Sequence, residues 1–236
     1  MKKNNTSIIV ALDYESISSI LNFADSVSPK DCKLKIGKAV FTKFGPILIR
    51  ELKNRGFDVF LDLKFHDIPN TVYKSICVAA ELGVWMVNVH SLGGKKMMIA
   101  AKNALYSSKK DAPILVAVTI LTSIDNIEIK YILGNNSDVF NYTMKLAELS
   151  KECGMNGVIC SGLEAKQIRK NFGLDFCIIT PGIRNINNKI NDQKRITSVF
   201  QSKQLGINYI IIGRPIIHSL NPSNTLKMYN KKLENM

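Results

Sequence analysis

The stretch that decides the fold is DVFLDLKF, residues 58–65. It is too short for a typical helix, and its apolar side chains are too continuous for a strand with one face in water. Such runs are typical of strands that are buried on both faces, as in parallel sheets. Seven further runs share this character: SIIVALD (7–13), LKIGKAV (34–40), WMVNVHS (85–91), ILVAVTIL (114–121), GVICS (157–161), CIITPGI (177–183) and YIIIGRPII (209–217).

Segments with helical spacing of apolar residues separate these runs. Examples are 15–27, 47–53, 79–82, 144–149 and 196–205, several of them followed by a glycine that ends the helix. Eight such strand–helix units in 236 residues predict an α/β protein with one (β/α)8 TIM barrel, a single domain over residues 1–236. A doubly wound open sheet uses the same units, but no GxGxxG motif follows the first strand, and the count of eight favours a closed barrel.

Composition excludes several other classes of protein. Hydrophobic residues make up 46% and charged residues 22% of the chain, which excludes a disordered protein. No apolar run approaches the roughly 18 residues that a membrane span requires, and the N-terminal region carries no signal-peptide pattern. The five cysteines lack the spacing of a zinc site or a disulfide framework, which favours free thiols. We therefore expect a cytoplasmic protein.

The formal net charge of +13 comes from 32 basic and 19 acidic residues. A positive charge of this size is compatible with a nucleic-acid partner. However, the lysines are scattered along the chain, and aromatic residues make up only 8%, without the basic, aromatic stripe typical of single-strand binding. A solvated surface shaped by AT-rich codons explains the charge better, and an anionic small substrate also fits it. We expect neither a nucleic-acid partner nor a membrane partner.

Polar and ionisable residues gather at the expected C-terminal ends of the strands. In a barrel these ends and the loops after them form the active site. Ionisable side chains inside apolar strands are unfavourable without partners, so their concentration at one end predicts a functional site there. The strand ends carry Asp13, Lys35, Asp62, Lys64, His90, Thr119 with Thr122, Ser161, Arg184 and Arg214.

The densest charged feature is LDLKFHDIPNT, residues 61–71. Alternation along a strand places Asp62 and Lys64 on one face, the barrel interior, while their apolar neighbours face the helices. Lys35 lies one strand earlier and Asp67 follows in the loop, so four charges of alternating sign converge. A lysine held between carboxylates stays protonated and can donate a proton. A purely structural ion-pair network is the alternative. His66 is expected either to pack or to support a neighbouring site residue, without touching the substrate itself.

The last two strands end in TPGIR (180–184) and IIIGRPI (210–216). In barrels, loops after strands seven and eight often bind phosphate. Gly213 allows close backbone approach, and Arg214 offers a bidentate guanidinium. The polar segment 184–195, including Gln193, has the composition of a lid over an anionic ligand, although a plain surface loop has a similar composition.

Together these motifs resemble the bacterial orotidine 5′-phosphate decarboxylase family. The resemblance covers residues 7 to 228. It is carried, in order, by VALD (10–13), KIGKAVFTKFG (35–45), FLDLKFHDIPNT (60–71), WMVNVH (85–90), TILTS (119–123), TPGIR (180–184), DQKR (192–195) and IIGRPI (211–216). It implies a TIM-barrel lyase of pyrimidine biosynthesis that converts orotidine 5′-phosphate to UMP and CO2 without a cofactor or a metal. It also implies a homodimer with shared active sites.

The resemblance implies the following roles. Lys64 is the proton donor within a catalytic array of Lys35, Asp62, Lys64 and Asp67, with Asp67 supplied by the other subunit. Asp13 and Lys35 bind the ribose, Asp67 and Thr71 contact the ribose of the neighbour's ligand, and Asp62 faces the substrate's carboxylate. Thr122, together with Ser123, lies near the pyrimidine. The lid and phosphate residues are Arg184, Gln193, Gly213 and Arg214.

A sugar-phosphate decarboxylase or aldolase of the same barrel group is the alternative. Those enzymes share a DxKxxD strand and resemble this chain in that respect, but they use Mg²⁺ as a cofactor. The FHDIPNT continuation (65–71) and Gln193 favour the orotidine 5′-phosphate decarboxylases.

Overall fold

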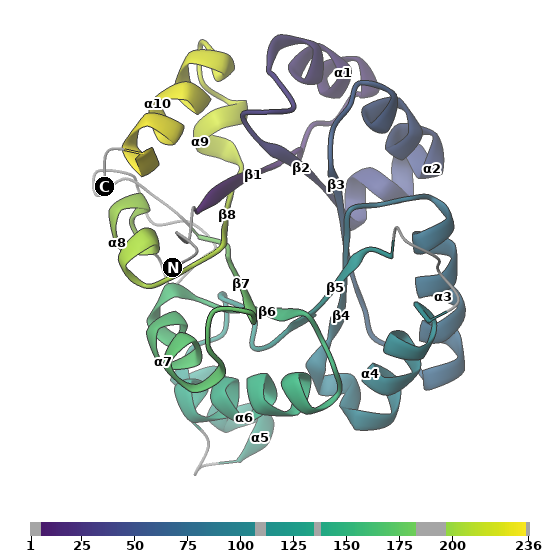
Figure 1. The fold of residues 1–236 in the computed structure, drawn as a ribbon, viewed down its shortest axis with the longest axis vertical. Helices are drawn as coiled ribbons and strands as arrows, with labels where there is room; N and C mark the ends of the chain where they lie inside the picture. Colours follow the sequence, from purple (N-terminus) through teal and green to yellow (C-terminus); the bar gives the residue numbers. More distant parts are fainter. Residues whose placement is uncertain (1–5, 107–111, 135–137, 183–196, 235–236) are drawn as a thin grey trace.

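The computed structural model describes residues 6–106, 112–134, 138–182 and 197–234. Its centre is a closed barrel in which each strand pairs in parallel with the next and β8 pairs with β1 (Figure 1). The predicted (β/α)8 barrel is confirmed. The strands are β1 (Ser7–Ala11), β2 (Lys33–Gly37), β3 (Val59–Phe65), β4 (Met86–His90), β5 (Ile114–Val118), β6 (Gly157–Ile159), β7 (Cys177–Thr180) and β8 (Tyr209–Ile212).

Helices form a ring outside the strands (Figure 1). They are α1 (Ile17–Ser26), α2 (Lys38–Asn54), α3 (Pro69–Glu81), α4 (Gly94–Asn103), α5 (Asn126–Leu133), α6 (Val139–Glu152), α7 (Gly162–Phe172), α8 (Val199–Gln204), α9 (Arg214–Ile217) and α10 (Pro222–Glu234), with a short 3-10 helix η1 (Ser91–Gly93). Local signals explain their boundaries. Ser16, for example, caps α1 by accepting a hydrogen bond from the Ser19 backbone N–H at 3.1 Å.

All eight predicted runs extend beyond the strands, and in two of them the last residues already form an α-helix. The run 34–40 ends as a strand at Gly37, and Lys38 already begins α2. The run 209–217 ends as a strand at Ile212, and its last four residues form α9. Pro215 suits the first turn of that helix, because proline fixes a helical φ where no N–H donor is needed. Apolar continuity alone did not reveal where the chain leaves the sheet.

The apolar strands are buried on both faces. Within β3, Phe60 points into the barrel and Leu61 points out into the layer between strands and helices. The inner layer is filled by Ile9, Ala11, Phe60, Met86, Val116, Val118, Ile159, Ile179 and Ile211. These side chains form a packed floor, so the polar residues that follow them in the strands lie above it, at the C-terminal end.

Aromatic and polar side chains close the opposite, N-terminal end of the barrel. Trp85 meets Tyr209 edge-on, with 5.1 Å between ring centroids, and the Lys33 ammonium lies 4.7 Å from the Trp85 ring centroid. At the same end, Asn208 Oδ1 accepts hydrogen bonds from the Ile178 backbone N–H at 2.8 Å and from Arg169 Nη2 at 2.6 Å. This end is closed by contacts within the chain.

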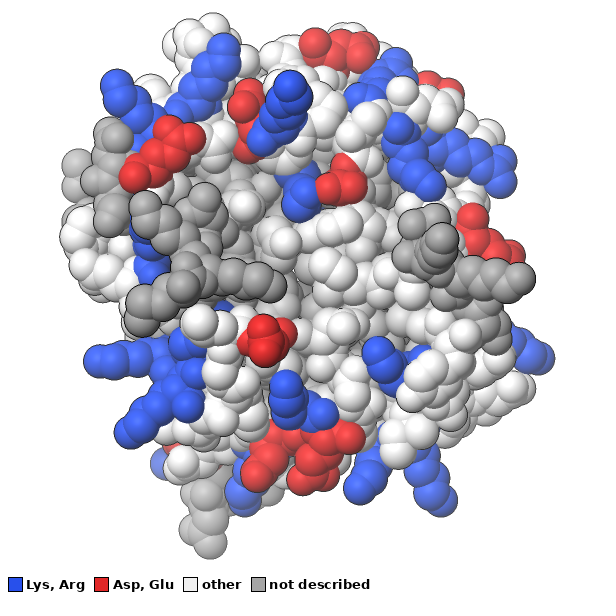
Figure 2. Space-filling view, viewed as in Figure 1, with Lys and Arg blue, Asp and Glu red and all other residues white. Residues whose placement is uncertain are grey.

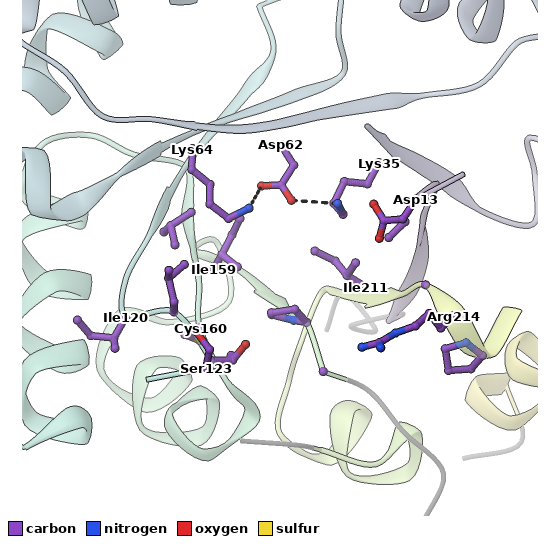
Figure 3. Close-up of a pocket in the computed structure, with 18 residues that line it drawn as sticks. Asp13, Lys35, Asp62, Lys64, Ile120, Ser123, Ile159, Cys160, Ile211 and Arg214 are labelled. Carbon is purple, nitrogen blue, oxygen red and sulfur yellow. Dashed lines mark hydrogen bonds and ion pairs between the residues drawn. The ribbon is translucent and has the colours of Figure 1, made fainter. Parts of the chain in front are cut away.

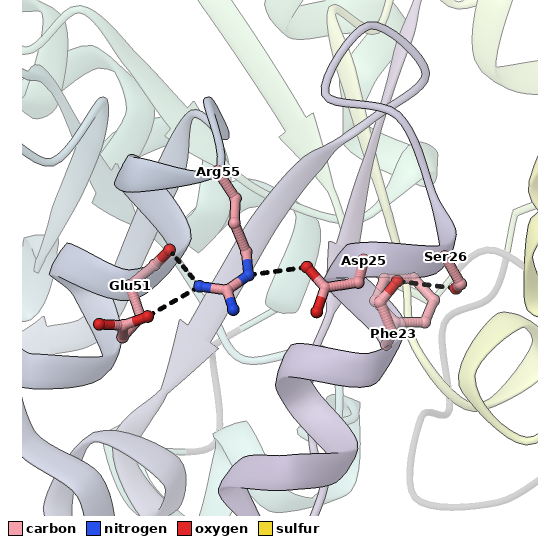
Figure 4. A network of polar contacts seen from close by, with 5 residues as sticks. All are labelled: Phe23, Asp25, Ser26, Glu51 and Arg55. Carbon is pink, nitrogen blue, oxygen red and sulfur yellow. Dashed lines mark hydrogen bonds and ion pairs between the residues drawn. The ribbon is translucent and has the colours of Figure 1, made fainter.

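The outer surface carries small ion pairs. Arg55, at the end of α2, donates to the Glu51 carboxylate and to Asp25 of α1, each at 2.8 Å (Figure 4). Figure 2 shows Lys and Arg side chains around the rim of the viewed face, with Asp and Glu between them. This distribution agrees with the expected solvated surface. None of the helices in the described ranges has the length and apolar character that crossing a bilayer requires.

Candidate active site

A pocket of about 400 Å³ opens at the C-terminal end of the barrel. The predicted residues that line it are Asp13, Lys35, Asp62, Lys64, Thr122, Gly213 and Arg214. Figure 3 shows the charged groups of β2 and β3 along one side and Arg214 on another. Facing the charged side are Ile120, Ser123, Ile159 and Cys160 (Figure 3). The pocket therefore combines a charged wall, an apolar wall and a cation at its end.

The charged wall is a row of three side chains. Asp62 Oδ2 lies 3.1 Å from Lys35 Nζ, and Asp62 Oδ1 lies 2.7 Å from Lys64 Nζ. Lys35 and Asp62 are buried, with 8% and 6% of their surface exposed, whereas Lys64 is half-buried and reaches the cavity. An ammonium between a carboxylate and an open cavity is placed to act on a bound molecule.

Burial by itself raises the pKa of the Asp62 carboxyl. The ammonium groups of Lys35 and Lys64, and hydrogen bonds from Lys64 and Asn88, outweigh burial and hold this pKa below its ordinary value. Asp62 is therefore ionised at neutral pH. Because the folded-state pKa is lowered, the ionised carboxylate stabilises the fold above the unfolded pKa, and this stability is lost as the pH falls through the folded value.

The backbone around Lys64 is irregular. Lys64 has φ of 50°, in the left-handed region that residues other than glycine rarely adopt. Between Leu61 and Phe65 the register of β3 against β4 shifts, so that four steps along β3 match two steps along β4, from Val87 to Val89. Lys64 and Asp62 meet inside the barrel, but they do so through this bulge rather than through the regular alternation that the sequence analysis assumed.

Asn88 is a site residue that the sequence analysis missed. It lies in the middle of β4 and is fully buried. Its Nδ2 donates to Asp62 Oδ1 at 2.7 Å, and its Oδ1 accepts from the Lys64 backbone N–H at 2.8 Å. The signal was present in MVNVH (86–90), where one amide interrupts an apolar strand, because a buried polar group needs partners.

His66 and His90 stack with their ring centroids 5.3 Å apart. Burial, together with the charges of His66, Lys64 and Lys38, lowers the pKa of His90 to about 4. His90 is therefore neutral at pH 7, and its Nδ1 accepts from the Leu92 backbone N–H at 3.3 Å. Among the residues that the structure describes, no group of three His, Cys, Asp or Glu side chains is arranged to hold a metal ion.

Two other strand-end residues have local structural contacts. Thr119 is fully buried and donates to the Ile159 carbonyl at 2.9 Å, which joins β5 to β6. Ser161 caps α7, accepting from the Leu163 backbone N–H at 3.2 Å. Neither residue lines the pocket.

Four predicted site residues are not brought into this pocket by the described chain. Asp67 and Thr71 are exposed and lie outside it, and Asp67 Oδ1 accepts from the Ile68 backbone N–H at 2.6 Å, at the start of α3. Arg184 and Gln193, with the predicted lid 184–195, lie outside the described residues.

The whole barrel, residues 6–229, matches the family model described as orotidine 5′-phosphate decarboxylase / HUMPS. The chain belongs to this family. Orotidine 5′-phosphate decarboxylases from Shigella flexneri and Escherichia coli are each 48% identical to it over 230 residues, covering 98% of this chain and 94% of the relative. The crystal structure of the orotidine 5′-phosphate decarboxylase from Lactobacillus acidophilus is 34% identical, with a TM-score of 0.86, and covers 97% of this chain and 99% of that one. Orotidine 5′-phosphate decarboxylases form UMP in pyrimidine biosynthesis.

Proposed function

We propose that this protein decarboxylates orotidine 5′-phosphate to UMP and CO2, with Lys64 as the proton donor. The observation that carries the proposal is the row Lys35–Asp62–Lys64 on one wall of a pocket whose far end holds Gly213 and Arg214. That arrangement suits a substrate with a carboxylate at one end and a phosphate at the other. The cytoplasmic location expected from the sequence is part of this proposal.

The chemistry follows from the charges. When the bond between C6 of the pyrimidine and its carboxylate breaks, CO2 leaves and the electron pair stays at C6. The Lys64 ammonium stabilises that negative charge and then transfers a proton to C6, and the neutral amine regains a proton from solvent. Asp62, ionised and fixed by three donors, faces the departing carboxylate and holds Lys64 in place. In this scheme protein ammonium groups supply the positive charge, and no cofactor takes part.

The remaining contacts bind the parts of the substrate that do not react. Arg214 and the backbone at Gly213 hold the phosphate, while Asp13 and Lys35 bind the ribose and Thr122 lies beside the pyrimidine. Asp13 and Gly213 are neighbours, since a Cβ at Gly213 would lie 3.8 Å from Asp13 Oδ2. Binding energy from the phosphate can be used to order the reacting groups. The family resemblance adds Arg184 and Gln193 to the residues proposed to bind the phosphate.

We also propose that the protein is a homodimer in which Asp67 and Thr71 complete the partner's pocket. Asp67 is exposed in its own chain, so it is available to a second copy. Exposed apolar side chains continue from it over neighbouring helices: Ile68 and Tyr73 at α3, Leu92 at η1 and Ile99 at α4. An apolar surface beside a charged group that its own pocket does not use suits an interface.

The direct test is a spectrophotometric assay of the purified protein with orotidine 5′-phosphate. We expect the substrate's absorbance to fall and UMP to accumulate, at the same rate in excess EDTA as without it. If the absorbance does not change, the proposal is wrong. Turnover of a sugar phosphate instead, lost in EDTA and restored by Mg²⁺, assigns the protein to the alternative class of sugar-phosphate decarboxylases and aldolases.

Replacement of Arg214 tests the phosphate end of the pocket. Arg214→Ala is expected to lower kcat/KM by about 100-fold, because it removes charge-assisted hydrogen bonds to the phosphate. Added guanidinium should restore part of the loss. The matched control is Arg50→Ala, since Arg50 is an exposed arginine on the outer helix α2. If Arg214→Ala and Arg50→Ala have the same kcat/KM, the phosphate binds elsewhere.

A further inference from the structure

Asn88 occupies the interior of the barrel at the layer just above the apolar floor. Along β4, Met86 points inward, Val87 outward, Asn88 inward and Val89 outward. Its exposed fraction is 0%, so its amide has no access to water. A buried amide is unfavourable unless both its oxygen and its nitrogen find partners. Those partners are two residues of one strand, Asp62 and Lys64.

The two bonds act on different parts of the charged row. The bond from Asn88 Nδ2 gives Asp62 Oδ1 a second donor beside Lys64 Nζ, both at 2.7 Å, while Asp62 Oδ2 takes Lys35 Nζ. The plane of the carboxylate is thereby fixed. The bond to Asn88 Oδ1 holds the Lys64 backbone N–H within the β3 bulge. It thereby stabilises the unfavourable backbone conformation of Lys64, whose φ is 50°.

We infer that Asn88 is a positioning residue for the proposed decarboxylation: its amide holds the Lys64 backbone and the Asp62 carboxylate in one geometry, so that the Lys64 ammonium meets C6 of the substrate. The inference rests on the proposed function. Asn88 itself does not line the pocket, so it acts through its two neighbours. A displacement of about 1 Å at a reacting group can lower a rate by about 100-fold.

The charged surroundings of Asn88 make its replacement by aspartate informative. Lys35 comes from β2, Asp62 and Lys64 from β3, and His90 follows on β4 itself, while the facing segment of β5, 116–118, carries no titratable side chain. In Asn88→Asp two carboxyl groups meet at the present 2.7 Å contact and share a proton, which raises the pKa of the pair. Below that pKa the protonated Asp replaces the amide donor, and above it two carboxylates repel each other.

The experiment compares Asn88→Ala and Asn88→Asp with wild type, measuring kcat and KM for orotidine 5′-phosphate from pH 6 to pH 9. For Asn88→Ala we expect kcat to fall by about 100-fold with KM changed less than about threefold, since the phosphate contacts remain. For Asn88→Asp we expect the activity relative to wild type to be at least about tenfold higher at pH 6 than at pH 9, because only the protonated pair keeps the geometry. This second variant gives an answer even if Asn88→Ala does not fold.

Asn208→Ala is the matched control. The Asn208 side chain also takes part in two hydrogen bonds, because its Oδ1 accepts from the Ile178 backbone N–H of β7 and from Arg169 of α7, but it lies at the N-terminal end of the barrel. It should lose thermal stability and keep the wild-type kcat and pH profile. A folded Asn88→Ala with kcat within about threefold of wild type overturns the inference, as does an Asn88→Asp to wild-type ratio that is flat with pH. Absence of turnover in wild type itself refutes the proposed function instead.

Discussion

Lys64→Ala is expected to lower kcat by at least about 10⁴-fold, because one side chain supplies both the stabilising charge and the proton. The fold should persist. Asp62 keeps the Lys35 ammonium and the Asn88 amide as partners, so its carboxylate is not left uncompensated. The measurement is the absorbance assay, run beside circular dichroism and a thermal melt. A variant that keeps a tenth of the wild-type kcat contradicts the role assigned to Lys64.

Lys33→Ala is the matched control for this loss. Lys33 is also a barrel lysine, on the neighbouring strand β2, but its ammonium lies over Trp85 at the N-terminal end. Its removal should lower stability without changing kcat. A comparable loss of activity in both variants would mean that the assay reports general damage to the barrel rather than chemistry at Lys64.

Recovery of activity in mixed dimers is the second large effect. Lys64→Ala and Asp67→Ala are each expected to be nearly inactive. If the two residues in one pocket come from different chains, a hybrid dimer has one doubly mutated pocket and one wild-type pocket. Refolding an equal mixture makes about half of the dimers hybrids by random pairing, so activity should return to about a quarter of the wild-type value. The activity of the refolded mixture is the measurement.

A reversed mixture controls for unspecific rescue. When wild type is refolded with an equal amount of the Lys64→Ala, Asp67→Ala double variant, both pockets of every hybrid carry one lesion. Activity should then fall to about a quarter, whereas a site built from one chain would leave about a half. No recovery in the first mixture after verified hybrid formation rules out the shared pocket, but not the decarboxylase activity.

The barrel was predictable because its signal is repeated. Eight apolar runs have the length and continuity of strands buried on two faces, and a parallel sheet with helices outside is the arrangement that buries both faces of all of them. The location of polar residues at one end of those runs then predicted which residues would surround a cavity. The limits of individual elements were harder, because Lys38 and Arg214 begin helices directly where strands end, with no polar loop between.

Details of the site depended on contacts that are not local in sequence. The bulge at Lys64 becomes visible only when β3 is paired with β4. The role of Asn88 becomes visible only from its 2.7 Å hydrogen bond to Asp62. A periodic pattern predicts which face a residue occupies in a regular strand, but it does not reveal a bulge that interrupts the alternation. Asp67 illustrates another limit, since the pocket proposed for it belongs to a second copy of the chain.

The left-handed conformation of Lys64 sets stability against activity at a single position. An L-residue held there is unfavourable by about 1–2 kcal/mol, a noticeable share of the 5–15 kcal/mol that typically separates folded from unfolded domains. Glycine adopts this conformation without strain but carries no ammonium. Lys64→Gly would therefore relieve the strain in the backbone, but it would also remove the ion pair with Asp62 and the proposed catalyst.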